Sequence, residues 1–260
     1  MIKIAAHNSS MFSKDNADIV CDGNADESEI KAAIELLPES GGHIALSDGD
    51  FVFSEMFPTS AKQLMITGAG MRSTILSFPN VENCIEPSSS WTIRDIEIVG
   101  GGGDYGIKMF PVHYCLFERI YISGVVKAGV RGESGNSQNT FNNVIVSGEP
   151  EYGFNYYGSC ISFNSCQAMR TNDKGGGVAG FNLHLTGGSL SGCVVEDWGA
   201  AFRFDNYCDK VSVFHPHVEG CLSDFVMTGS AVAPKNIRVF GGFHGGIVTN
   251  PQDMDIVFYE

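Results

Sequence analysis

The feature that most constrains this sequence is an internal repeat. Three ten-residue segments, 91–100, 115–124 and 139–148, align residue for residue, and each begins 24 positions after the one before it. They are rich in β-branched and aromatic residues, and no ten-residue helical pattern lies between them. A repeat of this length predicts a solenoid, because one unit buries its apolar face only by stacking on its neighbours.

A second phrase recurs within the same units. It reads Gly106-Ile-Lys, then Gly129-Val-Arg, then Gly153-Phe-Asn, and each copy begins another short apolar run. Since Gly and Asn separate the runs, we expect coils made only of strands, which is a parallel β-helix. A β-propeller is the alternative, but it needs blades of about 40 residues with alternating hairpin turns, and these are missing.

The composition agrees with one elongated domain. A hydrophobic fraction of 43% can fill a narrow core, and 32 glycines suit many tight corners. No segment has the composition of a linker. We therefore expect a single domain over 1–260, with an N-terminal cap at 1–42 and coils over 43–260.

The charge restricts the partners. A formal net charge of −14 argues against nucleic acid and against an anionic membrane surface. No stretch approaches 18 apolar residues, and the N-terminus lacks the apolar segment of a signal peptide, so we expect no membrane insertion. The localisation stays open; assembly in the cytoplasm with action on a virion or a cell surface is compatible with the sequence.

The eight cysteines show neither a CxxC pair nor zinc-ligand spacing. Cys166 and Cys193 fall in the same repeat column as Val144, so we expect small buried hydrophobes with free thiols.

A helix is predicted over 26–37. Ile30, Ala33, Ile34 and Leu37 share one face, Asp26 is placed to cap its start, and Pro38 ends it. Such a helix would close the open end of the solenoid and protect its bare strand edge.

The residues around this helix carry a family resemblance. The order is Asp22-Gly23, helix, Pro38, Gly41-Gly42, an apolar strand and Asp48-Gly-Asp-Phe51, and 64–70 continues it. This pattern, over roughly residues 15–100, resembles the opening of the pectate-lyase-like superfamily, which includes phage tailspike-type proteins. The resemblance implies a right-handed parallel β-helix that acts on or binds polysaccharide, in agreement with the general right-handedness of crossovers. It does not imply one reaction, since the superfamily holds lyases, hydrolases, epimerases and non-catalytic adhesins.

A corner is expected within each repeat. Apolar parity shifts by one residue after Phe117 and after Phe141, so the chain must turn there. Asparagine suits such a corner because it tolerates the left-handed region, and Asn142, Asn143 and Asn164 supply a partial asparagine ladder.

The strand after the variable loop presents two outward columns. Tyr157, His184 and Asp205 should stack on successive coils, and the column beside them comprises Lys108, Arg131, Asn155, Asn182 and Arg203. In the enzymes that the chain resembles, this outer face is the polysaccharide cleft. The alternative is a strand that is polar only because it faces water.

These residue types fit β-elimination on a uronate. That reaction needs neutralisation of the substrate carboxylate, a base for the adjacent proton and an acid for the leaving oxygen. The arginines and asparagines could meet the first need, His184 the second and Tyr157 the third.

A second cluster favours hydrolysis. Glu196 and Glu219 occupy equivalent places on adjacent coils, at a spacing that approaches that of a retaining glycosidase. Arg170 lies in the next column, and Trp198 could stack on a sugar ring, as could Tyr156 and Tyr207. A calcium-binding edge or a solvated corner is the alternative, so Ca²⁺ is the one cofactor considered.

We therefore expect a polysaccharide-binding and polysaccharide-degrading protein, with a lyase ahead of a hydrolase. The competing class is a non-catalytic glycan-binding or structural fibre, such as a phage receptor-binding protein, which would be a homotrimer.

Overall fold

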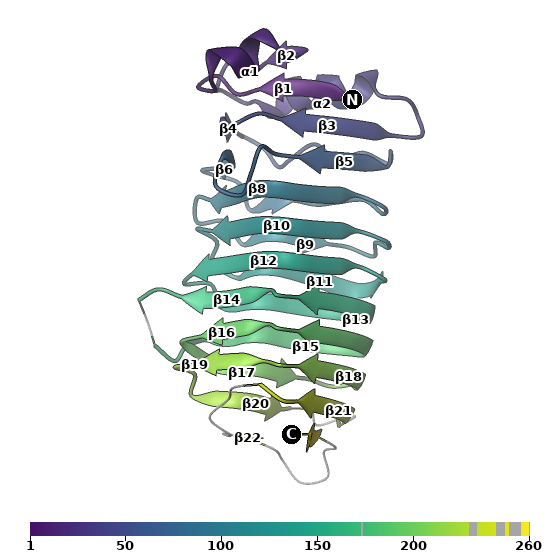
Figure 1. Cartoon of the computed structure of the whole chain (residues 1–260), viewed down its shortest axis with the longest axis vertical. Helices are drawn as coiled ribbons and strands as arrows, with labels where there is room; N and C mark the ends of the chain where they lie inside the picture. Colours follow the sequence, from purple (N-terminus) through teal and green to yellow (C-terminus); the bar gives the residue numbers. More distant parts are fainter. Residues whose placement is uncertain (173, 229–232, 243–247, 250–255, 260) are drawn as a thin grey trace.

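The repeats stack as successive coils of a parallel β-solenoid (Figure 1). The computed structural model describes residues 1–172, 174–228, 233–242, 248–249 and 256–259. Segments 24 residues apart pair directly, as when Phe117 lies beside Phe141. Each coil runs through three short parallel sheets. The predicted parallel β-helix is confirmed, and the propeller is excluded because the described pairings are parallel.

The first sheet contains the strands that begin each coil. They are β1 Ile2–Ala5 with β2 Ile19–Val20 beside it, β3 Gly42–Leu46, β5 Leu64–Thr67, the first parts of β8 Thr92–Gly100, β10 Leu116–Ser123 and β12 Thr140–Gly148, the last parts of β13 Tyr152–Asn164 and β15 Gly176–Ser191, then β18 Asp209–Phe214, β21 Lys235–Phe240 and β23 Ile256–Tyr259.

The second and third sheets complete the coil. The second has β4 Gly49–Val52, β6 Thr74–Phe78, the last parts of β8, β10 and β12, β14 Gln167–Arg170, β16 Val194–Glu196 and β19 His217–Glu219. The third has β7 Asn83–Ile85, β9 Tyr105–Met109, β11 Ala128–Ser137, the first parts of β13 and β15, β17 Trp198–Phe204, β20 Ser223–Met227 and β22 Val248–Thr249.

Stacked side chains fill the interior. Phe117, Phe141 and Phe163 stack with ring centroids 4.9 Å apart, and Phe154 lies 4.5 Å from Phe181 in a parallel column. These rings are fully buried. Repeating one apolar residue at one position per coil thus produces a continuous core, which is how a repeat unit too small to fold alone becomes stable.

The cysteines behave as expected. Cys166 and Cys193 are buried in the Val144 column, and all eight thiols are free.

The corner between the first and second sheets lies in the left-handed region on several coils. Asp95, Arg119, Asn143, Ser165 and His215 have φ between 48° and 60° at the junction of the first and second sheets. This conformation costs a non-glycine residue about 1–2 kcal/mol. The backbone N–H at the corner still bonds the next coil, as from Ser165 to the Ser191 carbonyl at 2.8 Å.

The expected asparagine corner is thus partly confirmed. Of the three predicted residues only Asn143 has a positive φ. Asn142 and Asn164 sit one place earlier, where Asn164 Nδ2 donates to Asn142 Oδ1 at 2.8 Å.

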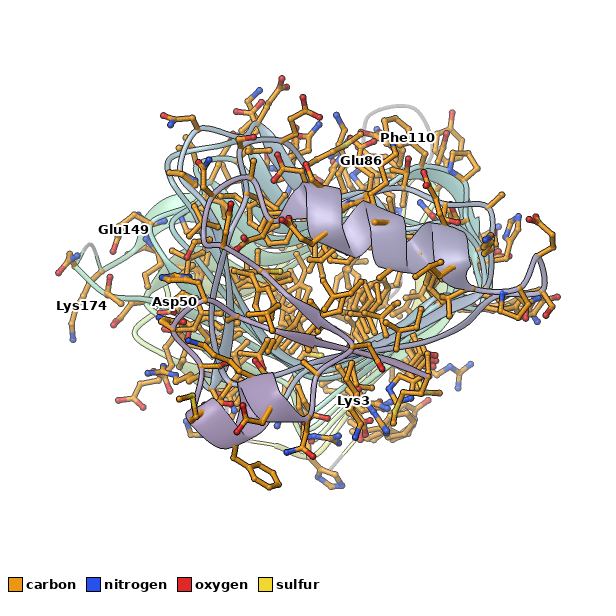
Figure 2. The ribbon with its side chains drawn as sticks, turned by 90° about the horizontal axis from the view of Figure 1, so that it is seen from above. Lys3, Asp50, Glu86, Phe110, Glu149 and Lys174 are labelled. Carbon is orange, nitrogen blue, oxygen red and sulfur yellow. The ribbon has the colours of Figure 1, made fainter. Side chains whose placement is uncertain are left out.

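Two helices cap the N-terminal end: α1 Met11–Asp15 and α2 Glu27–Leu36. Viewed from above, α2 lies across the end of the solenoid, over the packed interior (Figure 2). The predicted apolar face of α2 is buried. The predicted role of Asp26 is wrong, because its carboxylate accepts the backbone N–H groups of Gly23 and Val52, which ties the cap to β4 instead of capping the helix.

Candidate functional site

The predicted basic and amide column exists on the outer face of the third sheet. Register places its members on five consecutive coils, in the order Lys108, Arg131, Asn155, Asn182, Arg203. The column crosses β9, β11, β13, β15 and β17 in the middle of the solenoid (Figure 1).

The sequence predicts that the two asparagines of this column, Asn155 and Asn182, face solvent, and this prediction is wrong. Both are buried, because the amides turn toward each other and toward the neighbouring histidine. Asn182 Nδ2 donates to Asn155 Oδ1 at 3.1 Å and lies 3.4 Å from His184 Nε2. Asn182 Oδ1 has no hydrogen-bond partner among the described residues. A buried acceptor left in this state favours binding of a donor, because leaving it unpaired costs roughly 1–3 kcal/mol.

The cations of the column already have partners. Arg131 holds Glu133 with both Nε and Nη2, at 3.1 and 3.0 Å. Arg203 Nη2 lies 3.4 Å from Asp205 Oδ2. Lys108 Nζ lies over the rings of Tyr105 and Phe110. The positive charge that a substrate carboxylate would meet is therefore partly neutralised.

Tyr157, His184 and Asp205 come together as predicted. The Tyr157 and His184 rings stack with centroids 3.6 Å apart and planes 10° apart. His184 Nε2 lies 3.5 Å from Asp205 Oδ2, and the His184 side chain is only 12% exposed. Burial lowers the pKa of His184 to about 4, although the Asp205 carboxylate opposes the shift. Burial also raises the pKa of Tyr157. At neutral pH the pair is thus a neutral imidazole, which can accept a proton, beside a protonated phenol, which can donate one.

A hollow of about 290 Å³ opens at this end of the third sheet. Its walls include Ser134, Gly135, Tyr157, His184, Thr186 and Tyr207. The Tyr207 side chain is prominent there, with the residue 63% exposed. The volume is near the lower limit of about 300 Å³ for ligand sites, so the hollow suits part of a polymer rather than a large isolated molecule.

Several of these walls were not predicted, because they come from an irregular part of strand β11. Gly132 pairs with Tyr156, 24 positions on, but Asn136 pairs with Gly158, only 22 positions on. The two extra residues in β11 form a bulge that carries Ser134 and Gly135 to the rim. The signal of this bulge in the sequence is the change in the repeat interval from 24 to 22 residues.

The second predicted cluster also forms, but elsewhere. Glu196 and Glu219 are register partners on β16 and β19. Glu219 has a side chain that is 70% exposed and lies 3.7 Å from His217 Nε2. The seven residues of β17 separate this corner from Asp205, a span of roughly 20 Å. The two clusters therefore cannot act on one sugar linkage.

The predicted ligand contacts of Arg170 and Trp198 are wrong for this structure. Trp198 is fully buried, and Arg170 is buried with its guanidinium 5.2 Å from the Trp198 ring. Arg170 also pairs with Glu149 and donates to the Pro150 carbonyl. Glu149 lies near the projecting loop that carries Lys174 (Figure 2). Both predicted residues hold this loop on the coil, and Tyr156 is likewise buried in the core.

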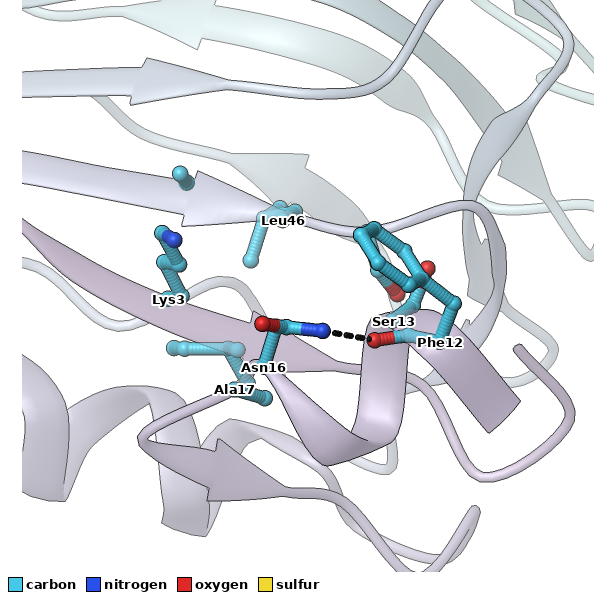
Figure 3. A pocket seen from close by; sticks show the side chains of 9 residues that line it. Lys3, Phe12, Ser13, Asn16, Ala17 and Leu46 are labelled. Atoms are coloured by element: carbon cyan, nitrogen blue, oxygen red, sulfur yellow. Dashed lines mark hydrogen bonds between the residues drawn. The ribbon is translucent and has the colours of Figure 1, made fainter. Parts of the chain in front are cut away.

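The N-terminal cap offers two further features. An apolar hollow of about 230 Å³ lies between α1 and β3, where Asn16 Nδ2 donates to the Phe12 carbonyl (Figure 3). Among the described residues, Cys21, Asp26 and Glu29 are the group whose ligand atoms lie close enough, within 4.8 Å, to share a metal ion. Burial raises the pKa of the Cys21 thiol to about 12, and the Asp26 carboxylate is occupied by backbone N–H groups. These residues fit a structural role better than a metal site.

Comparison with known proteins agrees with the fold. No family model matches the sequence, and no curated protein matches it either. Solved structures do match. Pectate lyase Pel9A superposes with a TM-score of 0.60 at 14% identity, over 98% of this chain and 74% of that one. Alginate lyase from Paenibacillus sp. str. FPU-7 gives 0.60 at 14%, over 89% and 88%.

The fold is a parallel β-helix, as in these two lyases. A rice weevil pectin methyl esterase shares it, with a TM-score of 0.57 at 10% identity over 91% of this chain and 85% of that one. At such identities the likeness shows the fold alone. Within the described ranges no helix is long and apolar enough to cross a membrane.

Proposed function

We propose that this protein binds a uronate-bearing polysaccharide on the outer face of the third sheet and cleaves it by β-elimination. The observation that carries the proposal is the stacked Tyr157–His184 pair at the hollow, with His184 neutral and Tyr157 protonated at neutral pH.

In this scheme His184 takes the proton next to the substrate carboxylate. The electrons of that C–H bond form a new C=C bond, the C–O bond of the linkage breaks, and Tyr157 gives its proton to the leaving oxygen. Arg131 and Arg203 face the carboxylate on which negative charge develops. Asp205 orients His184, and Asn182 Oδ1 accepts a hydrogen bond from a sugar hydroxyl. No water is consumed.

The products test this proposal. A panel of uronate polymers, such as polygalacturonate and alginate, is incubated with the protein beside neutral glucans, with and without EDTA. We expect ultraviolet absorbance from unsaturated ends to grow with reducing ends on uronate polymers only, and to persist in EDTA. Reducing ends without unsaturation would overturn the lyase in favour of a hydrolase.

A second candidate is glycan binding without cleavage. It is favoured by the pairing of Arg131 with Glu133 and of Arg203 with Asp205, which leaves less charge to stabilise an enolate. A matched structure, "Geobacillus virus E2 - ORF18", has a TM-score of 0.50 at 13% identity, and shows that the fold also occurs in a viral protein. Tight binding with no new ends on any polymer would support this candidate. The homotrimer stays a prediction, which sedimentation of the protein would test.

A further inference from the structure

Three exposed basic side chains gather on the outer face of the first sheet: Lys210, Lys235 and Arg238. They come from adjacent coils, because Asp209 pairs with Lys235 and Ser212 with Arg238. Within the described part of the chain no carboxylate lies at ion-pair distance from any of the three. The arginines of the third sheet, in contrast, are already paired. In a protein of net charge −14, such a cluster is a local site for anions.

A hollow of about 260 Å³ lies at this cluster and is lined by Lys210, Ser212, Asn236 and Arg238. All four side chains can donate hydrogen bonds, and none of the described residues that line the hollow has a carboxylate. Asn236 Nδ2 donates to Asp209 Oδ1 at 2.7 Å, which holds its amide between the coils. The Arg238 guanidinium donates through Nη1 to Tyr259 Oη at 3.1 Å and is thus positioned beside the ring. A guanidinium with a neighbouring ammonium matches a carboxylate.

An aromatic ladder lies on the same sheet and contacts Arg238 through Tyr259. Phe214, Phe240 and Tyr259 stack on consecutive coils, with centroids 4.9 and 4.6 Å apart. Phe214 and Phe240 follow Ser212 and Arg238 by two positions, so they share the outer face of the sheet. Donors beside an apolar wall suit a sugar acid, whose ring has apolar faces and whose carboxylate is charged.

We propose that the hollow lined by Lys210, Ser212, Asn236 and Arg238 is a second binding site for the carboxylate groups of an acidic polysaccharide. The ligand class rests on the proposed function. The position agrees with it, because only the turn 206–208 separates Asp205 at the end of the third sheet from Lys210 in the first sheet. A polymer that leaves the His184 hollow over Tyr207 reaches the basic hollow around this corner.

Binding of polygalacturonate, measured by affinity electrophoresis in the His184→Ala background so that no chain is cut, tests the site. The double variant Lys210→Ala/Arg238→Ala should bind about tenfold more weakly, as expected for two exposed charge contacts, and the difference should shrink at high salt. The control Lys14→Ala/Lys31→Ala removes the same charge from the N-terminal cap and should bind as the parent does.

Equal binding by the two double variants would overturn the site. A tenfold loss that is matched by an equal loss of single-stranded DNA binding would overturn its assignment to polysaccharide. If no polymer yields unsaturated ends but the loss is specific to polygalacturonate, the β-elimination fails and the second site stands. If uronate polymers yield unsaturated ends but the two double variants bind polygalacturonate equally, the second site is wrong and the β-elimination stands.

Discussion

The two ends of β17 carry the two clusters that the repeat singles out, and they are built differently. At one end His184 is stacked on Tyr157, mostly buried and placed at a hollow walled by a bulge. At the other end Glu219 is mostly exposed beside His217. Both clusters arise from the same stacking of coils. The comparison teaches that register brings side chains together, whereas burial and the walls of the hollow change their chemistry.

The largest expected contrast is in turnover. His184→Ala should lower turnover of a uronate polymer by about 10²–10⁴-fold, since it removes a general base. Glu196→Gln and Glu219→Gln, the matched changes at the other end of β17, should change it less than about threefold. Initial rates from unsaturated ends measure this, with circular dichroism as the control for folding. Loss in the glutamate variants alone would move the active site to their corner.

Stability should differ in the same way between Trp198 and Tyr207, two of the three aromatic residues that the sequence predicts to contact sugar. Trp198→Ala should lower the free energy of unfolding by about 3–5 kcal/mol, because the ring is fully buried. Tyr207→Ala, at the exposed end, should change it by no more than about 0.5 kcal/mol. Urea denaturation measures both. A comparable loss in the two variants would show that Tyr207 packs in the core.

The pH profile sharpens the role of His184. With its pKa near 4, the base is active in the neutral form, so turnover should rise through pH 4 and then level off. Asp205 raises the pKa of His184, and Asp205→Asn should therefore move the rising limb to lower pH. Initial rates between pH 3 and 7 measure the limb. A rising limb that moves to higher pH in Asp205→Asn would contradict the contact between Asp205 and His184.

The last expected effect concerns acid stability. His184 has a pKa near 4 when folded and an ordinary value of 6.5 when unfolded. As the pH falls through this window, the unfolded state binds a proton that the folded state does not, so the stability falls. His184→Gln lacks this term, and its melting temperature should decline less between pH 6.5 and 4. Parallel decline in the two proteins would show that His184 is accessible to protons when folded.

The sequence was sufficient for the coil and for the two outer columns, because a β-helix turns a fixed repeat interval into spatial neighbours. Tyr157, His184 and Asp205 were therefore predicted correctly as a group. The alternation of apolar and polar residues shows only on which face of a strand a side chain lies. It could not show that Asn155 and Asn182 turn toward each other, or that Trp198 turns inward against Arg170.

Irregular and short elements limited the rest of the prediction. The bulge in β11, which supplies Ser134 and Gly135, breaks the interval by two residues, and no pattern indicates where the displaced chain goes. The helix α1 was also not predicted, since its five residues bury none of their side chains and so leave no periodic apolar signal.

The left-handed corners leave room for improvement by design. Arg119, Ser165 and His215 hold a conformation that asparagine or glycine adopts at lower cost, and the backbone N–H groups of Ser165 and His215 bond the next coil whatever the side chain is. Replacing them with asparagine would extend the column of Asn143, one place after the short ladder of Asn142 and Asn164, along one edge of the cylinder. A more heat-resistant scaffold could thus be obtained without altering any residue of the third sheet.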